Sequence, residues 1–147
     1  MIASLAQGGM VLNNEQYIKE AINAADFVHE HLQRNDGRLV KRYRQGHSGL
    51  DPHINDYSFM IWGLINLYEA TYKTLYLSRA LKLTEVMIED FYDENGGFFI
   101  GSKNAEKLII RAKDYYDGAI PSGNSAAIYS LFKLVKITGN TDWINIA

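Results

Sequence analysis

The sequence contains no cysteine and only two prolines among its 147 residues. Without cysteine there are no disulfides, no thiol catalysis and no thiolate metal sites. This fits a reducing compartment, so we expect a cytoplasmic protein. Because prolines are so few, long helices can run without interruption. Both absences favour a helical domain that is not stabilised by cross-links.

A strong charge of one sign and long apolar runs are also missing. The 15 Lys and Arg and the 17 Asp and Glu residues leave a formal net charge of −2. We therefore expect neither nucleic acid nor a membrane as a partner. No apolar stretch approaches membrane-spanning length, and the N-terminus lacks both a charged leader and a long apolar run. We expect no transmembrane helix and no signal peptide.

What the sequence does have is an alternation of two kinds of helical segment. Hydrophobic residues make up 47% of the chain, which is ample for the core of a single domain spanning residues 1–147. Three segments are apolar all round and should be buried, whereas three have one polar face and should lie outside. The buried type covers 1–12, 56–72 and 124–138, and the amphipathic type covers 15–33, 76–92 and an element beginning at Trp143.

An internal repeat accompanies this alternation. An aromatic residue, an aliphatic residue, two variable residues and alanine recur at 17–21, 76–80 and 143–147, each time after a polar junction. Each repeat is then one helical hairpin. The pattern predicts an all-α fold, a partial α/α toroid of about two to three hairpins with small β-hairpin insertions in its loops. Residues 38–44 have an extended pattern, and we expect 98–100 and 108–110 to pair as a short hairpin. Since the first segment has the pattern of the back half of a helix, we expect a fragment of a larger toroid.

The candidate site lies where a loop meets the third buried helix. Residues 117–125 have the sequence Asp-Gly-Ala-Ile-Pro-Ser-Gly-Asn-Ser, and such a junction offers free backbone N–H groups beside hydroxyl and amide groups. Asp117 and Asp56 are the catalytic candidates, because each lies at the N-terminal side of a buried helix and carboxylates can act as general acid and base. The alternative is that Asp56 caps its helix, which we prefer, and that Asp117 holds a turn, which stays equally open.

Six further residues are candidates for binding a substrate. Arg111 could pair with a substrate carboxylate, but an internal salt bridge with Asp114 or Asp117 is the preferred interpretation. Ser122 could bind a sugar hydroxyl or act only as an N-cap. The remaining four are an aromatic pair that could stack on a sugar and two amides that could bind hydroxyls, Tyr57, Tyr116, Asn55 and Asn124.

The histidines do not form a metal motif. His29 and His31 are two apart on a helix and face different directions. His47 and His53 share a loop with Asp51, but no third ligand stands at motif spacing. We expect no metal and no cofactor. A Gly-x-Ser-x-Gly elbow is also absent, which argues against a serine hydrolase.

Several motifs resemble the C-terminal part of the YyaL/spermatogenesis-associated protein 20 family, whose other members carry a thioredoxin-like domain. They are Asp56-Tyr57, the residues 68–71, the residues 93–99 (Asp-Glu-Asn-Gly-Gly-Phe-Phe), Arg111 and the residues 117–125. The resemblance implies a slice of a six-hairpin glycosidase-like toroid, related in fold to N-acylglucosamine 2-epimerases. Asn55 stands where the family usually has an acidic residue, which weakens a mechanism that needs a carboxylate pair there.

Two functions follow as expectations. In the first, the pole at the N-terminal ends of the inner helices binds or processes a small carbohydrate or related polyol. In the second, the chain is a non-catalytic structural or interaction fragment. In an incomplete toroid the apolar sides of the terminal hairpins are exposed to solvent. We therefore expect a homo-oligomer or association with the rest of a larger toroid.

Overall fold

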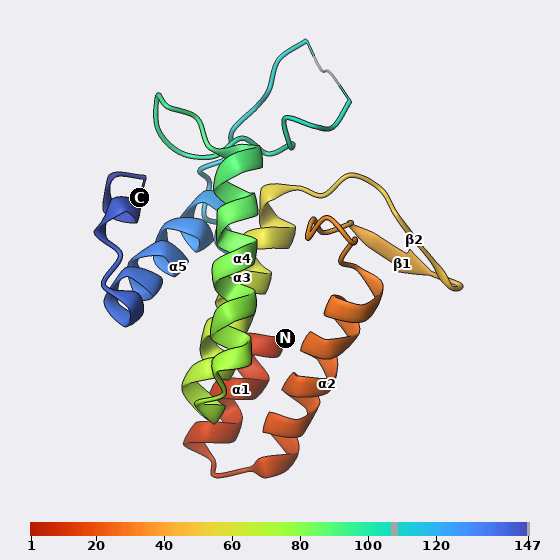
Figure 1. Ribbon diagram of the computed structural model, residues 1–147, viewed down its shortest axis with the longest axis vertical. Helices are drawn as coiled ribbons and strands as arrows, with labels where there is room; N and C mark the ends of the chain where they lie inside the picture. Colours follow the sequence, from red (N-terminus) through yellow and green to blue (C-terminus); the bar gives the residue numbers. More distant parts are fainter. Residues whose placement is uncertain (107–108, 147) are drawn as a thin grey trace.

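The computed structural model describes residues 1–106 and 109–146. In this part of the chain there are five α-helices, one 3-10 helix and one pair of short strands (Figure 1). The elements are α1 (Ile2–Val11), α2 (Glu15–His31), β1 (Arg42–Arg44), β2 (His47–Gly49), α3 (Ile54–Thr71), α4 (Thr74–Phe91), α5 (Gly123–Thr138) and η1 (Thr141–Asn145). The five predicted helices are confirmed, with ends that differ by up to two residues.

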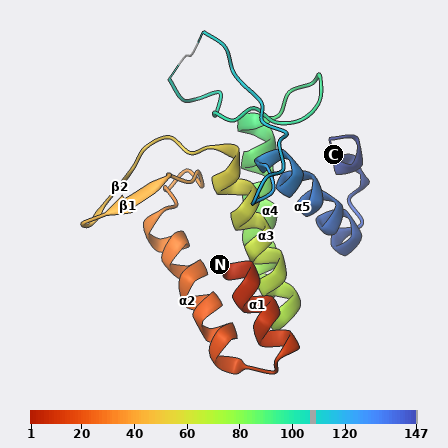
Figure 2. The ribbon, with the colours of Figure 1, turned by 180° about the vertical axis from the view of Figure 1, so that it is seen from behind.

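Helix α3 is the centre of the molecule. It packs against α1 on one side and α5 on the other, and the outer helix α4 forms a hairpin with it. Helix α2 pairs with α1 in the same way. The inner helices are therefore α1, α3 and α5, and the outer helices are α2 and α4 (Figures 1 and 2). This confirms the all-α fold with alternating inner and outer helices.

The burial of α3 follows from its composition. Ten of its 18 residues are buried, including Tyr57, Ile61 and Leu64, and they lie on every side of the helix. The amphipathic α2, by contrast, buries only Ala21 and Ala25. A helix without a polar face must be covered all round, whereas a helix with one needs a single apolar contact. The core is formed by α3 together with the inner faces of its neighbours.

The capping residues explain where several of the helices begin and end. Asn14 accepts hydrogen bonds from the backbone N–H groups of Gln16 and Tyr17 at the start of α2, and Ser122 accepts one from Ser125 at the start of α5. Helix α5 ends at Gly139, whose left-handed backbone suits glycine. Helix α3 begins at Ile54, two residues before the predicted start, because His53 rather than Asp56 is its N-cap.

The position of the β-hairpin is a correction. The strands are β1 and β2, joined by Gln45 and Gly46, which both have positive φ as a tight two-residue hairpin turn requires. The segment 98–100 does not form a strand; Phe98 is buried in the core and makes an isolated bridge with Tyr92. In the other expected strand, residue 108 lies outside the described residues, and Ile109 and Ile110 are in no strand.

The long loops gather at one end of the molecule. The connections from α2 to α3 and from α4 to α5 lie at the upper end of Figure 1, where α3 and α5 begin, and the short turns lie at the lower end. We call the upper end the pole. None of the helices in the described residues is long and apolar enough to cross a membrane.

Candidate functional site

Asp117 holds the turn that leads into α5. Its Oδ1 accepts the backbone N–H of Ser122 at 2.8 Å, and its Oδ2 accepts the hydroxyl of Ser125 at 3.0 Å. These hydrogen bonds, first the backbone N–H of Ser122, hold the pKa of the Asp117 carboxyl below its ordinary value. A carboxylate with a lowered pKa stays ionised at neutral pH, which does not suit a general acid.

Asp56 forms a capping box at the start of α3. Its Oδ2 accepts the backbone N–H of His53 at 2.7 Å, three residues earlier. Asp56 is thus the third residue of the helix and not the N-cap that the sequence predicts, although its contribution to the helix end is similar. Both candidate carboxylates are hydrogen-bonded to their own local backbone. The catalytic role of each stays a prediction.

Two of the residues expected to bind a ligand are core residues instead. Tyr57 is fully buried, its hydroxyl accepts the backbone N–H of Leu39 at 2.8 Å, and burial raises its pKa to about 12. Asn124 is also buried. It accepts the N–H of Phe98 at 2.7 Å and donates to the carbonyls of Phe98 and Asp114, each at 2.9 Å. Neither side chain is available to a sugar.

The other expected binding residues lie at the pole. Asn55 and Tyr116 are exposed, whereas Ser122 is buried and caps α5. The side chain of Asn55 lies against Gly123, so the first turns of α3 and α5 touch here. The structure brings Asn55, Asp117, Ser122 and Asn124 together around the start of α5. It does not bring Asp56 and Asp117 into contact with each other.

Arg111 binds backbone carbonyls rather than the expected aspartates. Its Nη2 donates to the carbonyl of Gly101 at 2.9 Å and to that of Asp90 at 3.2 Å. Its guanidinium lies 4.0 Å from the ring centroid of Phe99. Its Nε is buried and has no hydrogen-bond partner among the described residues. The internal salt bridge with Asp114 or Asp117 is therefore not formed.

Beside Arg111 the loops enclose a cavity of about 560 Å³, which we call the pole pocket. Its wall combines polar and charged side chains with apolar ones. The polar and charged members are Asp51, His53, Ser102, Lys103, Glu106 and Arg111, and the others are Pro52, Ile100, Gly101, Ala105, Ile110 and Ala112. Pockets of this size and mixed lining are typical of small-molecule sites.

The wall of the pole pocket is anchored to α4 through a buried carboxylate. Asp90 accepts from Nε and Nη2 of Arg38 at 2.9 and 3.1 Å and from the amide of Asn104 at 2.8 Å. The N–H of Lys103 also donates to the carbonyl of Asp90 at 2.9 Å. These bonds fix the 101–106 loop, because a paired buried carboxylate is costly to release.

Sequence reasoning pointed to part of this pocket. His53 and Asp51 were considered with His47 as metal ligands, and Arg111 as the partner of a carboxylate. Nothing in the sequence links these residues to the 102–106 segment. His53 lies near Lys41, whose Nζ is 3.0 Å from Nδ1 of the imidazole. The described residues contain no group of three or more acidic or imidazole side chains that could hold a metal ion.

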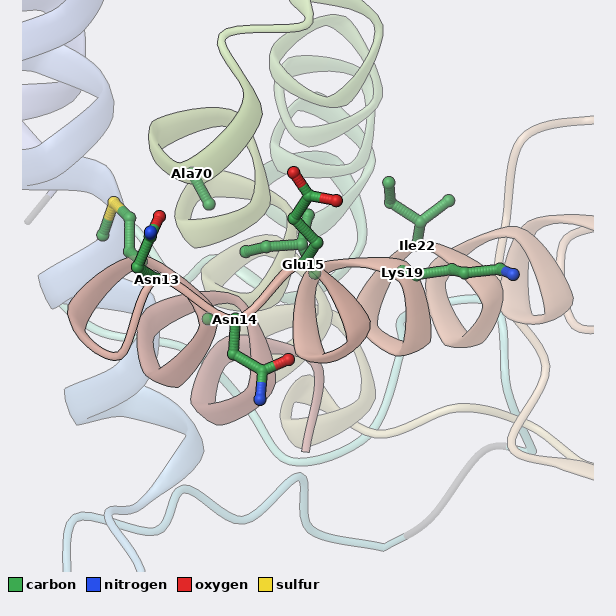
Figure 3. A pocket seen from close by; sticks show the side chains of 9 residues that line it. Asn13, Asn14, Glu15, Lys19, Ile22 and Ala70 are labelled. Atoms are coloured by element: carbon green, nitrogen blue, oxygen red, sulfur yellow. The ribbon is translucent and has the colours of Figure 1, made fainter.

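A second pocket of about 440 Å³ lies at the opposite end of the molecule (Figure 3). Asn13, Asn14 and Glu15 form its edge at the α1–α2 turn, with Lys19 and Ile22 further along α2 and Ala70 across from them on α3. We call it the turn pocket. The side-chain oxygen of Asn14 already caps α2.

Similarity to known proteins extends over nearly the whole chain. The chain is 33% identical to spermatogenesis-associated protein 20 of Rattus norvegicus and 34% identical to that of Homo sapiens, in each case over 99% of this chain and 20% of the relative. The chain thus spans about a fifth of the length of these relatives. No family model matches it.

A solved structure shares the fold. It is a GH76 α-mannanase from Bacteroides thetaiotaomicron, with a TM-score of 0.73 and 21% identity over 98% of this chain and 36% of that one. This confirms the α/α toroid architecture. The relatives confirm the resemblance stated above to the YyaL/spermatogenesis-associated protein 20 family.

Proposed function

From the homology of the chain to one segment of the spermatogenesis-associated protein 20 family, we propose that this six-hairpin glycosidase-like module binds a small carbohydrate or related polyol in the pole pocket. The observation that carries the proposal is the pole pocket itself. Sugars present hydroxyls that need donors and acceptors and apolar faces that need carbon surface. The pocket wall offers both kinds of group within one cavity.

The proposed function is binding rather than catalysis by Asp56 and Asp117. Asp117 has each of its carboxylate oxygens in a hydrogen bond, and Asp56 has one of its oxygens in a bond to the N–H of His53. A general acid needs a pKa raised towards the working pH, whereas the pKa of Asp117 is lowered. We therefore assign both carboxylates to holding the inner helices at the pole. The α-mannanase supports carbohydrate as the ligand class only through the shared fold.

The test is to fill the pole pocket. In Ala112→Trp an exposed wall residue becomes bulky, and in the matched control Ala119→Trp the same change is made in a pole loop outside the pocket. We expect titration calorimetry to detect binding of glucose, mannose, N-acetylglucosamine or glucuronate to the parent chain. Ala112→Trp should weaken that binding by about tenfold, while Ala119→Trp leaves it unchanged. Equal binding by all three proteins, or no binding of any sugar, contradicts the proposal.

A specific observation favours a second candidate, an interaction module. Tyr129 and Phe132 on α5 are 44% and 46% exposed, although α5 is an inner helix. Helix α3, by contrast, is contacted by an inner helix on both sides, α1 and α5, whereas α3 is the single inner helix that packs extensively against α5 in the described residues. An exposed apolar face of an inner helix is suited to packing against another helical hairpin, and we assign that role to a second copy of the chain.

A further inference from the structure

The positive charge of Arg111 has no negative partner among the described residues. An arginine is always charged in a protein, and charges in partly buried positions are normally paired. The seven ion pairs of the described residues include Arg34, Arg38, Arg79, Lys103, Lys113 and Lys133, but not Arg111. Arg111 is held by two neutral carbonyls and the face of Phe99.

The donors of Arg111 are also incompletely used. Nη2 has two acceptors, one for each of its hydrogens. Nε is buried without a partner, and no described acceptor is bonded to Nη1. A buried donor without a partner is costly, so such a group calls for an explanation. Because Arg111 lines the pole pocket, an anion entering the pocket would compensate its charge.

We propose that the pole pocket selects sugars that carry an anionic oxygen group, a carboxylate or a phosphate, and that Nη1 of Arg111 donates to this group. The inference rests on the proposed function, which supplies the sugar. Since both hydrogens of Nη2 are already used, Arg111 contacts one oxygen of the anion through Nη1 and does not form a two-pronged pair. The carbonyls and Phe99 hold the guanidinium in place before the ligand arrives.

The other charges of the pocket wall adjust this preference. Lys103 adds a second cation, and its ion pair with Glu89 is long, at 3.5 Å, and exposed. Asp51 and Glu106 are exposed carboxylates in the same wall and repel an anion. Exposed charges are screened by water, whereas Arg111 is partly buried and acts at closer range. The net preference is therefore for an anionic ligand beside Arg111.

The experiment compares five ligands at constant ionic strength by titration calorimetry on the whole chain. Glucose, glucuronate and glucose 6-phosphate share the ring and differ in the anionic group, and acetate and inorganic phosphate supply the group without a ring. We expect glucuronate or glucose 6-phosphate to bind about tenfold more tightly than glucose. Acetate and inorganic phosphate should bind more weakly than either anionic sugar. The tighter of the two anionic sugars identifies carboxylate or phosphate as the preferred group.

Single substitutions test which residues cause the preference for an anionic sugar. Arg111→Gln should abolish the preference, so that the anionic sugars bind no more tightly than glucose does, provided that its far-ultraviolet circular dichroism matches the parent. Lys103→Gln should weaken binding of the anionic sugar by about threefold, and Asp51→Asn should strengthen it by about threefold. Both residues are exposed, so even if Arg111→Gln fails to fold, these two variants still test whether the anionic group binds in the pole pocket. Lys19→Gln, a matched change in the turn pocket, should have no effect.

The outcomes separate the two proposals. If no sugar binds, the proposed function fails, and this inference fails with it. If glucose binds as tightly as both anionic sugars, only the preference for an anion is overturned. Acetate or phosphate binding as tightly as the sugars, or an effect of Lys19→Gln equal to that of Lys103→Gln, also overturns it.

Discussion

Tyr57 and Asn124 are buried polar residues, and each supplies a hydrogen bond to a backbone group that lacks a partner in regular structure. The Tyr57 hydroxyl accepts the N–H of Leu39, and the Asn124 amide bonds both the N–H and the carbonyl of Phe98. The gain comes from avoiding an unsatisfied buried group, because each such group costs more than a single hydrogen bond returns. At this scale polar side chains join loops to the inner helices.

Tyr57→Phe tests this role. The change removes only the hydroxyl and leaves the buried N–H of Leu39 without an acceptor, so we expect the free energy of unfolding to fall by about 1–2 kcal/mol. Urea denaturation followed by circular dichroism measures it. The control Tyr72→Phe alters a tyrosine that is 81% exposed and should change the free energy of unfolding by less than about 0.5 kcal/mol. An unchanged midpoint for Tyr57→Phe would show that Leu39 finds another acceptor.

The sequence did not reveal these roles because the partners are distant in the chain. Tyr57 and Leu39 are 18 residues apart, and Asn124 and Phe98 are 26 apart. An aromatic or amide side chain beside a polar loop has the same local pattern whether it faces a ligand or a buried backbone group. Asp117 and Ser122 were easier to interpret, since their partners lie within eight residues and turn and cap chemistry is local.

At the scale of elements, the close contact between α3 and α5 depends on Gly123. It is the first residue of α5 and lies against Ile54 and Asn55, the first two residues of α3. A Cβ atom at this position would lie 2.6 Å from Cγ2 of Ile54, well inside van der Waals contact. The contact joins the two helix starts that form the pole.

Gly123→Ala should therefore destabilise the fold, although alanine is the better helix former. Ile54 is buried and cannot move aside, so overpacking outweighs the gain in helix propensity, and we expect a loss of about 1–3 kcal/mol. Thermal unfolding measures it. Gly49→Ala is the control, because a Cβ atom there meets nothing within 4 Å. A Gly123→Ala protein as stable as the parent would indicate that α3 and α5 can separate at little cost.

Helices could be predicted more fully than strands, for a physical reason. The extended pattern of 38–44 includes β1, but the pairing of β1 with β2 was not predicted. Each helix has the burial period that its apolar residues imply, so type and position followed from the sequence. The strands β1 and β2 are largely exposed on both faces, and their turn is Gln45-Gly46 rather than Asn-Gly. The apolar residues of 98–100 predicted a strand, but the side chain of Phe98 is buried in the hydrophobic core instead.

At the scale of the whole molecule, the inner helices differ in how far they are covered. The α3–α5 contact includes the rings of Trp62 and Tyr129, with centroids 5.2 Å apart, and the ion pair of Glu69 with Lys133 at 2.7 Å. Tyr129 and Phe132 nevertheless remain about half exposed. The repeat predicted this arrangement of layers, and the fold is confirmed. The extent of the domain stays a prediction.

We expect self-association through this face of α5. Burying two aromatic side chains per copy favours a dimer that forms in the micromolar range. Sedimentation velocity at a series of concentrations should show a dimer for the parent chain and a monomer for Phe132→Glu. Phe27→Glu, at an equally exposed aromatic residue of the outer helix α2, should leave the dimer intact. A parent chain that sediments as a monomer throughout would exclude this association.

The central place of α3 also has a consequence for motion. In the part of the chain that the structure describes, helices α2, α4 and α5 each contact fewer helices than α3 does, so each can fray or detach while the others stay in place. Helix α3 cannot open until its neighbours have left, because it contacts α1, α2, α4 and α5. Its backbone amides should therefore exchange hydrogen with solvent more slowly than any others, at the rate of global unfolding.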